Sequence, residues 1–279
     1  MNNILVTGGA GYIGSHVVEQ LLKMKKRVFI VDNLSTGYKK LVNKKAKFFL
    51  CDIKNYEKLN KIVFKNQISS VIHLAAKLSV GESQKKPKKY YFNNVLGTKN
   101  IVKCCKKNKI NNLIFSSTCA VYKDKLRIVK ENSKVKPKSV YGKTKYLGEK
   151  FIKESLKNTP TSYAILRYFN VAGASESGKI GQVSKGDQLF KNLSIASIKV
   201  KPKINIYGKN YKTKDKTCIR DYIHVSDIAK IHILVLKRIN RKKESITLNC
   251  GYGKGISVLD AIKEFQKQSK KKIEIRIKN

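Results

Sequence analysis

The sequence is poor in acidic residues, arginine and proline, and it has no tryptophan. Its 279 residues include 18 Asp and Glu against 61 Lys and Arg, which gives a formal net charge of +43. Such a balance is typical of nucleic-acid-binding proteins, but these rely on Arg for bidentate contacts with phosphates and bases. Only seven of the basic residues are Arg, and the lysines are spread from end to end. We therefore interpret the charge as mainly compositional and do not expect nucleic acid as a partner.

Long apolar runs and paired cysteine motifs are also missing. No run approaches the roughly 20 residues of a membrane span, and Met1 leads into a short apolar stretch and glycines, unlike a signal peptide. The six Cys contain no Cys-x-x-Cys pair, and the four His show no ligand spacing with them. These absences predict a soluble, cytoplasmic protein with reduced thiols, no metal site and no membrane partner.

Short apolar runs alternate with longer amphipathic stretches along the chain. The expected strands are 4–7, 28–32, 47–52, 70–74, 112–117, 162–167 and 246–250, and the expected helices are 15–24, 56–64, 97–107, 141–157 and 225–238. Several runs are apolar on both faces, as in buried parallel strands. The alternation predicts an α/β fold with a doubly wound parallel sheet. Residues 174–217, rich in Lys, Gly and Ser, are expected to form a loop-rich insertion or second lobe.

A glycine-rich stretch directly follows the first expected strand. Gly8, Gly11 and Gly14 have the spacing G-x-x-G-x-x-G and precede an amphipathic helix. In this context glycines let backbone N–H groups approach a pyrophosphate at the helix N-terminus. Asp32 ends the second expected strand, where its carboxylate would bind a ribose 2′-OH and repel a 2′-phosphate. The pattern predicts a Rossmann-type site that prefers NAD to NADP, with Asp52 as a candidate adenine contact.

Tyr141 and Lys145 begin an expected helix and share one of its faces, since they are four residues apart. A tyrosine of ordinary pKa, about 10, is a poor base at neutral pH. A nearby ammonium and a positively charged nicotinamide would lower that pKa and favour the phenolate. Thr118 lies at the carboxyl end of an expected strand, where open sheets bind ligands. These three residues are candidates for exchanging a proton with a sugar hydroxyl while hydride moves to NAD.

Taken in order, these motifs resemble those of the extended short-chain dehydrogenase/reductase family, and within it the NAD-dependent epimerases and dehydratases that act on UDP-sugars. The segments that carry the resemblance are 7–14, 31–37, 73–76, 80–83, 93–95, 97–98, 115–118, 141–145, 167–170 and 218–225. They span essentially the whole chain. The resemblance implies an isomerase of carbohydrate metabolism that inverts C4 of UDP-galactose or UDP-glucose. Hydride would leave C4 for NAD, the 4-keto sugar would turn, and hydride would return on the other face.

The resemblance also implies which residues bind each ligand. The expected cofactor contacts are Gly8, Gly11, Tyr12, Ile13, Gly14, Asp32, Asn33, Leu34, Ser35, Asp52, Ile53, Leu74, Ala75, Ala76, Asn93, Tyr141, Lys145 and Phe169. The expected substrate contacts are Thr118, Tyr141, Asn170, Tyr207 and Arg220, the last as a partner for the diphosphate. Tyr141 would act as acid and base, Lys145 would orient it and hold the nicotinamide ribose, and Thr118 would assist at the sugar hydroxyl.

Domain organisation and assembly follow from the same resemblance. Residues 1–170, with 216–250 returning to them, would bind NAD, and 171–215 with 251–279 would form a smaller sugar-nucleotide-binding lobe. The lobe is expected to be incomplete at the C-terminus, because members of the family usually continue beyond the position of Asn279. Segment 175–191 also lacks the acidic stretch with His and Pro that is usual there. A homodimer is expected through helices near 93–107 and 141–157, although both carry many lysines.

Three alternatives stay open at this point. Another NAD-dependent nucleotide-sugar epimerase, reductase or decarboxylase would share most of these motifs. A dehydratase is disfavoured because Cys119 and Ala120, rather than an acidic pair, follow Thr118. A truncated chain would be catalytically impaired, and a basic nucleic-acid-binding protein would use the net charge without a recognisable motif.

Overall fold

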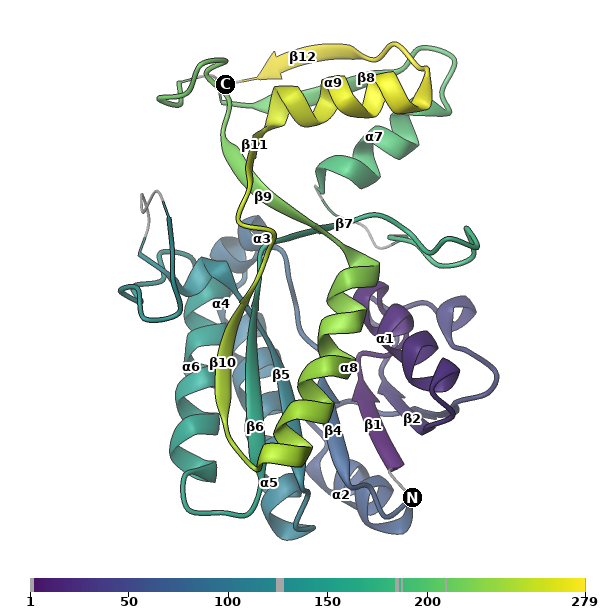
Figure 1. Ribbon diagram of the computed structural model, residues 1–279, viewed down its shortest axis with the longest axis vertical. Coiled ribbons are helices and arrows are strands. Elements are labelled where there is room, and N and C mark those ends of the chain that lie inside the picture. The colour runs from purple at the N-terminus through teal and green to yellow at the C-terminus, as the bar shows by residue number, and fades with distance from the viewer. Residues whose placement is uncertain (1–2, 124–127, 184–185, 187, 209, 279) are drawn as a thin grey trace.

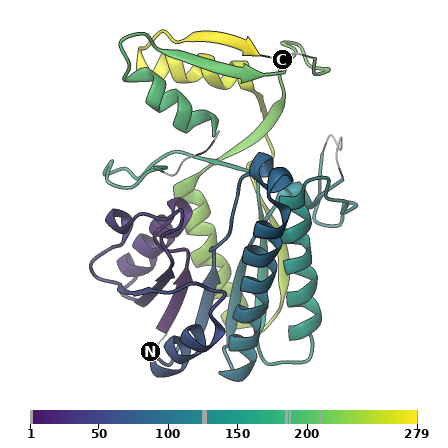
Figure 2. The same ribbon diagram turned by 180° about the vertical axis from the view of Figure 1, so that it is seen from behind.

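The structure is a computed structural model that describes residues 3–123, 128–183, 186, 188–208 and 210–278. Its larger part is a sheet covered by helices, and a smaller lobe lies at the end of the molecule away from the N-terminus (Figures 1 and 2). None of the described helices is long and apolar enough to cross a membrane.

Seven parallel strands form the main sheet in the order β10-β6-β5-β4-β1-β2-β3. Their bounds are β1 Asn3–Thr7, β2 Arg27–Asp32, β3 Lys47–Leu50, β4 Ser70–His73, β5 Asn112–Thr118, β6 Ser162–Tyr168 and β10 Ile246–Cys250. All seven expected strands lie in this sheet, so the predicted fold class is confirmed. The strand order reverses at β1, which pairs with both β2 and β4. Open sheets bind ligands at such a switch point, beyond the carboxyl ends of the strands.

Helices cover both faces of this sheet. Their bounds are α1 Tyr12–Lys23, α2 Tyr56–Lys65, α5 Gly97–Lys107, α6 Val140–Leu156 and α8 Val225–Lys242. Since strand side chains alternate, Ile4 and Val6 lie in one core with α1 and α8, whereas Leu5 lies in a second core with α2, α5 and α6. Burial on both faces explains why the strands are continuous apolar runs in the sequence.

Several short elements lie between the main ones. They are α3 Val80–Lys85, α4 Pro87–Tyr90, the π-helix η2 Tyr91–Leu96, and the 3₁₀ turns η1 Lys39–Leu41 and η3 Cys119–Val121. The π-helix continues into α5 and carries Asn93, one of the expected cofactor contacts. Because π-helical turns are rare and often occur at functional sites, η2 marks this region for inspection.

The smaller lobe has its own core. Helices α7 Leu189–Ser197 and α9 Val258–Ser269 pack with the parallel pair β8 Lys203–Tyr207 and β12 Glu274–Lys278. The strands β7 Asn170–Ala172, β9 Ile219–His224 and β11 Gly255–Ser257 form a three-stranded sheet beneath it. Residues 174–217 are therefore less loop-rich than expected, because they contain α7 and β8. Ile204 and Ile206 alternate with polar residues in β8, but the lysines around them obscure this pattern.

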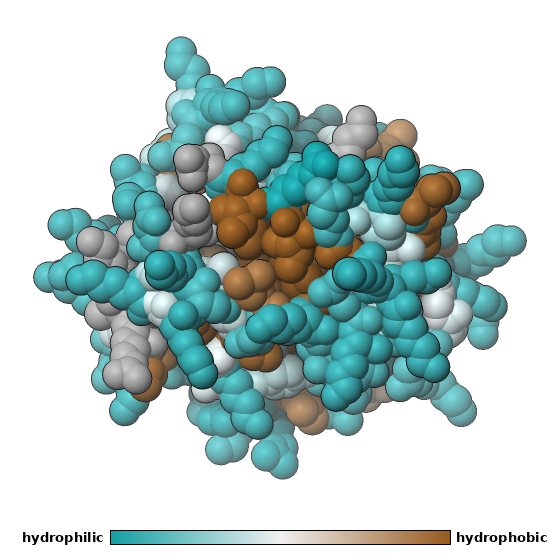
Figure 3. Space-filling view, turned by 90° about the horizontal axis from the view of Figure 1, so that it is seen from above, coloured by the Kyte–Doolittle hydropathy of each residue, from teal (hydrophilic) through white to brown (hydrophobic). Residues whose placement is uncertain are grey.

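The lobe leaves apolar side chains at its surface. Seen from its end of the molecule, an apolar area lies in the middle of a hydrophilic surround (Figure 3). Ile198 and Val200, just after α7, are 85% and 98% exposed. A unit this small cannot bury all of its apolar surface in a core of its own.

Candidate active site

The turn from β1 into α1 requires glycine at one position in the loop and at one in the first turn of the helix. Gly8 has φ +75, and a Cβ there would lie 2.7 Å from the backbone nitrogen of Ala75. A Cβ on Gly14 would collide with the carbonyl oxygen of Gly8. Among the described residues no side chain caps α1, and its first turn has no acidic residue. Its N–H groups and positive end are therefore available to an anion such as a pyrophosphate.

Gly14→Ala tests the importance of this close approach. The methyl group would displace the loop at a cost of about 1–3 kcal/mol. We therefore expect dinucleotide affinity to fall by roughly tenfold or more. Cofactor content after purification and calorimetric titration with NAD measure this effect. Gly81→Ala is the control, because a Cβ at Gly81 meets open space. Unchanged NAD affinity in a folded Gly14→Ala variant would contradict the prediction.

Asp32, at the end of β2, is buried and oriented by the backbone. Its Oδ2 accepts a hydrogen bond from the Ala10 N–H at 3.1 Å, and its Oδ1 accepts one from the Leu34 N–H at 2.8 Å. Burial raises the pKa of the Asp32 carboxyl, and these two hydrogen bonds and the charge of Lys77 oppose the rise. Each carboxylate oxygen keeps a further lone pair. Asp32 can therefore still accept the hydroxyls of a ribose placed beside the loop.

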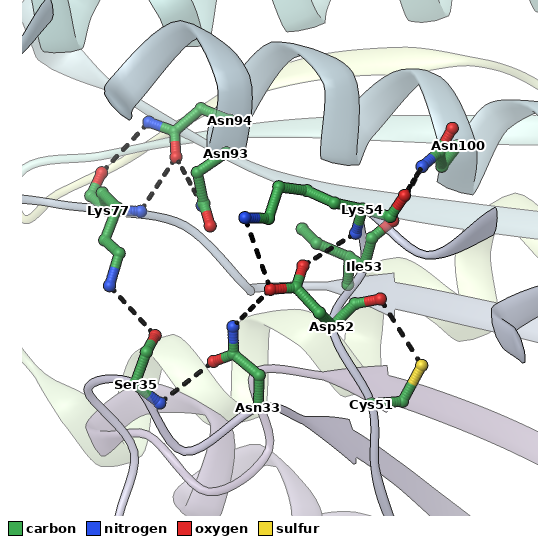
Figure 4. Close-up of polar contacts among 10 residues, drawn as sticks. All are labelled: Asn33, Ser35, Cys51, Asp52, Ile53, Lys54, Lys77, Asn93, Asn94 and Asn100. Atoms are coloured by element: carbon green, nitrogen blue, oxygen red, sulfur yellow. Dashed lines mark hydrogen bonds and ion pairs between the residues drawn. The ribbon is translucent and has the colours of Figure 1, made fainter. Parts of the chain in front are cut away.

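The segments after β2, β3 and β4 bring Asn33, Asp52 and Lys77 close to one another (Figure 4). The Asn33 side chain donates a hydrogen bond to Asp52 Oδ2 at 2.9 Å. The same oxygen lies 3.6 Å from the ammonium of Lys54. Lys77, after β4, reaches across to the Ser35 hydroxyl at 3.0 Å. Burial lowers the pKa of Lys77. The sequence interpretation did not single out Lys77, which is a half-buried cation directed into the expected cofactor region.

Asn94 connects this region to α6. Its Oδ1 accepts hydrogen bonds from the Lys77 N–H at 2.8 Å and from the Asn93 side chain at 3.0 Å. Its Nδ2 donates to the carbonyl of Lys77 and to the hydroxyl of Thr144, each at 3.1 Å. Asn94, which the sequence interpretation did not assign a role, therefore holds Asn93 and the segment after β4 against the helix of the Tyr-Lys pair.

His73 is a buried, neutral connection between β1 and α5. The Thr98 hydroxyl donates to the carbonyl of Asn94 at 2.7 Å, so its oxygen must accept from His73 Nε2–H at 3.1 Å. His73 Nδ1 is then left to accept from the Thr7 hydroxyl at 2.7 Å. Burial lowers the pKa of His73 to about 3, and the charge of Lys145 adds to this. We therefore assign His73 a structural role rather than one in proton transfer.

Tyr141 lies in the first turn of α6, and hydrogen bonds hold this turn in place. The Ser139 hydroxyl caps the helix, and the Tyr141 N–H donates to the Ser83 hydroxyl of α3 at 3.1 Å. Thr118 lies close enough to the phenol hydroxyl for its side chain to lower the pKa of Tyr141. The two predicted hydroxyl groups therefore lie near each other at the carboxyl end of β5.

Among the protein's own groups, burial is the largest influence on the pKa of Tyr141. Burial raises the pKa of Tyr141 to about 12, and the nearby Thr118 side chain opposes this only in part. Burial also lowers the pKa of Lys145 to about 7, against the effect of Glu149. Desolvation of both groups thus outweighs the attraction between a phenolate and an ammonium.

Lys145 points toward the end of β5. It is 3% exposed, and its ammonium donates to the Ser116 carbonyl at 2.7 Å and contacts the Ser116 hydroxyl at 3.3 Å. One turn further along α6, Glu149 forms a buried ion pair with Arg167 of β6. The sequence interpretation missed the ion pair of Glu149 and Arg167. The spacing of Lys145 and Glu149 does place these two residues on one helix face.

The expected substrate contacts are only partly brought together. Asn170 donates to the carbonyl of Asp221 at 3.1 Å, which ties β7 to the strand that carries Arg220. Burial raises the pKa of Cys119, which follows β5, and the charge of Arg220 on β9 opposes this rise. Tyr207, in contrast, is 68% exposed on β8.

The remaining expected cofactor contacts lie around the same edge of the sheet. The Tyr12 hydroxyl donates to the carbonyl of Gly173 at 2.7 Å, and Phe169 follows β6. Ile13 is in the first turn of α1, Ile53 is buried after β3, and Leu74, Ala75 and Ala76 follow β4. Within the described part of the chain no group of three or more His, Cys, Asp or Glu side chains could hold a metal.

The fold, the glycine loop and the pair of Tyr141 and Lys145 on α6 define a dinucleotide-dependent protein of the short-chain dehydrogenase/reductase class. The model of the NAD dependent epimerase/dehydratase family matches residues 4–251, and the chain belongs to this family. The chain is 42% identical over 276 residues to the UDP-glucose 4-epimerase of Haemophilus influenzae, covering 95% of this chain and 82% of that relative.

Solved structures show the same similarity. The UDP-glucose 4-epimerase from Brucella ovis in complex with NAD is 33% identical, with a TM-score of 0.94 over 100% of this chain and 86% of that one. The UDP-glucose-4-epimerase from Stenotrophomonas maltophila with bound NAD and formylated UDP-arabinopyranose gives the same identity, TM-score and coverage. The predicted family resemblance is thus confirmed, and these matches do not favour the nucleic-acid-binding alternative.

Proposed function

We propose that this protein is an NAD-dependent isomerase that interconverts UDP-galactose and UDP-glucose by inverting C4 of the hexose. The observation that carries the proposal is that Tyr141 lies near Thr118 while the Lys145 ammonium is directed to Ser116, at the edge of the sheet that also carries the glycine loop. It is supported by the similarity to UDP-glucose 4-epimerases along almost the whole chain.

The residues around the switch point fit NAD. The N-terminus of α1 would hold the pyrophosphate and Asp32 the adenosine ribose, while Asn33 and Asp52 would lie at the adenine. Lys77 adds a cation, beyond those expected from the sequence, for an anionic part of the cofactor. When bound, NAD supplies the hydride acceptor and donor.

The protein's own contribution to the reaction is placement and proton transfer. Tyr141 would exchange a proton with the C4 hydroxyl, and Thr118 would hold the same hydroxyl through its own side chain. The protein's own groups favour the protonated phenol, since burial raises the pKa of Tyr141 to about 12. The positive charge of an oxidised nicotinamide close to the ring would favour the phenolate. Asn170 and Arg220 would hold the UDP part of the substrate.

The proposal includes the domain roles, the assembly and the compartment. We assign NAD binding to residues 1–170 with 216–250, and sugar-nucleotide binding to 171–215 with 251–279. We further propose a homodimer through α5 and α6 that acts in galactose metabolism in the cytoplasm. The six cysteines are free, which supports a reducing compartment.

A direct assay tests the proposal. The purified chain is denatured to identify released NAD, and the intact protein is incubated with UDP-galactose while UDP-glucose is followed by a coupled dehydrogenase. We expect bound NAD and conversion in both directions. A protein that is folded and binds NAD but converts neither UDP-hexose would overturn the proposal.

A further inference from the structure

Glu149 and Lys145 have the spacing of an ion pair but do not form one. They lie four residues apart on α6, and their side chains are 1% and 3% exposed. Acidic and basic residues with this spacing usually attract each other, and burial strengthens the attraction. In the described structure, however, the Lys145 ammonium bonds to Ser116, and the carboxylate of Glu149 turns to Arg167.

Arg167 engages both oxygens of Glu149. Its Nε donates to Oε1 at 3.0 Å and its Nη2 donates to Oε2 at 2.6 Å, while the Ser117 hydroxyl also donates to Oε1. This bidentate geometry matches the rigid guanidinium fork to a carboxylate. Little acceptor capacity of Glu149 remains for a further cation.

Further contacts fix the guanidinium in place. Its Nη1 donates to the Tyr122 hydroxyl at 2.9 Å and to the carbonyl of Glu131 at 3.1 Å. The Tyr122 ring also lies against it, 4.8 Å from the guanidinium carbon. Arg167 is therefore held from several sides and directs Glu149 away from Lys145.

We propose that Arg167 is a positioning residue for the reaction. By holding both oxygens of Glu149, it prevents this carboxylate from capturing the Lys145 ammonium, which stays directed to the end of β5 beside Tyr141. The inference rests on the proposed function, because it concerns how the acid-base pair of that reaction is kept available.

The charge on Lys145 should report this role. The titratable groups that face it are Tyr141 and Glu149 on α6 and His73 on β4, with Arg167 of β6 behind Glu149, whereas β5 contributes only neutral groups. Burial lowers the pKa of Lys145, and Glu149 raises it. Without Arg167, Glu149 would turn to Lys145 and raise that pKa further.

The pH dependence of the holoenzyme tests the proposal. The base form of the site requires one proton to leave the coupled Tyr141 and Lys145 pair, so the acid limb of kcat/KM for UDP-galactose follows this ionisation. In Arg167→Met we expect the limb to move to higher pH by about one to three units, because a carboxylate close to an ammonium raises the pKa of the ammonium by about this amount. In Arg167→Met with Glu149→Gln the limb should return to the wild-type position or below it.

Arg238→Met is the matched control. Arg238 pairs with Glu244 at the surface at 2.6 Å, so its removal also deletes an ion-paired arginine without touching the site. We expect its acid limb to coincide with that of the wild type. A purely structural role of Arg167 would lower stability or rate without moving the limb selectively.

The remaining outcomes are also decisive. An unmoved limb in folded Arg167→Met, or a shift that persists in the double variant, would overturn the proposal. If Arg167→Met does not fold, Arg167→Lys should give a smaller shift in the same direction, because one ammonium cannot hold both oxygens. No shift in that variant would likewise overturn it.

Failure of the proposed function can be told apart from failure of this inference. A wild-type protein that is folded but inactive on UDP-galactose contradicts the function alone. The pH dependence of the unfolding midpoint then reports the Lys145 ionisation without turnover. Wild-type stability should begin to rise at lower pH than that of Arg167→Met. Coincident stability profiles would overturn the inference.

Discussion

Replacing Tyr141 by Phe is expected to lower kcat for UDP-galactose by about 100- to 10,000-fold. The substitution removes only the hydroxyl near Thr118 and leaves the half-buried ring in place. Because the contacts of the ring with its surroundings persist, NAD content and the unfolding midpoint should stay close to those of the wild type. Initial rates, cofactor content and thermal unfolding of the same preparations measure these three quantities.

Tyr146→Phe is the matched control for this substitution. Tyr146 is half-buried on the same helix, so its variant also removes one phenol hydroxyl from α6. We expect its kcat to equal that of the wild type. If Tyr141→Phe turned over UDP-galactose at the wild-type rate, proton transfer by Tyr141 would be refuted.

The main sheet could be predicted from the sequence because its strands are buried on both faces. Residues such as Ile4, Leu5 and Val6 alternate between two cores and therefore form an uninterrupted apolar run. β9 could not be recognised in the same way. It carries Arg220 and Asp221 and is mostly exposed or half-buried, so the sequence there has no apolar run.

Some residues of the candidate site could likewise be predicted from the sequence, and others could not. Gly14, Asp32 and the pair Tyr141 and Lys145 have local spacings that a sequence displays directly. The roles of Lys77 and Arg167 depend on partners distant in the chain, since Lys77 reaches Ser35 and Arg167 reaches Glu149. In a chain with 61 basic residues, nothing local distinguishes Lys77 from its neighbours.

The direction of the Tyr141 pKa shift could not be derived from the sequence either. Sequence reasoning counts the charges near Tyr141, whereas the extent of desolvation depends on how α6 packs against β5. Burial is the largest influence on the pKa of both Tyr141 and Lys145. Tyr141 and Lys145 are therefore uncharged to a greater extent than their spacing implies, and the positive charge of an oxidised nicotinamide would add to that of Lys145 in favouring the phenolate.

Lys145→Met is expected to lower activity but to raise the stability of the folded protein at neutral pH. It should lower kcat by about 100-fold or more, because Tyr141 loses the cation that supports its phenolate. It should also change how stability depends on pH in the cofactor-free protein. Burial lowers the pKa of folded Lys145 from 10.5 to about 7. Between these values the unfolded chain binds more protons than the folded one.

Wild-type stability should therefore rise by up to about 1.4 kcal/mol for each pH unit from about pH 7 to about pH 10.5. The Met variant lacks this contribution, so its stability relative to the wild type should be greatest near neutral pH and decline as pH increases. Loss of the hydrogen bonds to Ser116 offsets the gain by about 1–3 kcal/mol.

Urea unfolding of the cofactor-free proteins between about pH 7 and about pH 10.5 measures the difference in stability between the wild type and Lys145→Met. Lys150→Met, which replaces an exposed lysine of the same helix, should show no such trend. Parallel stability curves for the wild type and Lys145→Met would mean that the buried lysine keeps its full charge, and the inferred balance between desolvation and catalysis would have to be abandoned.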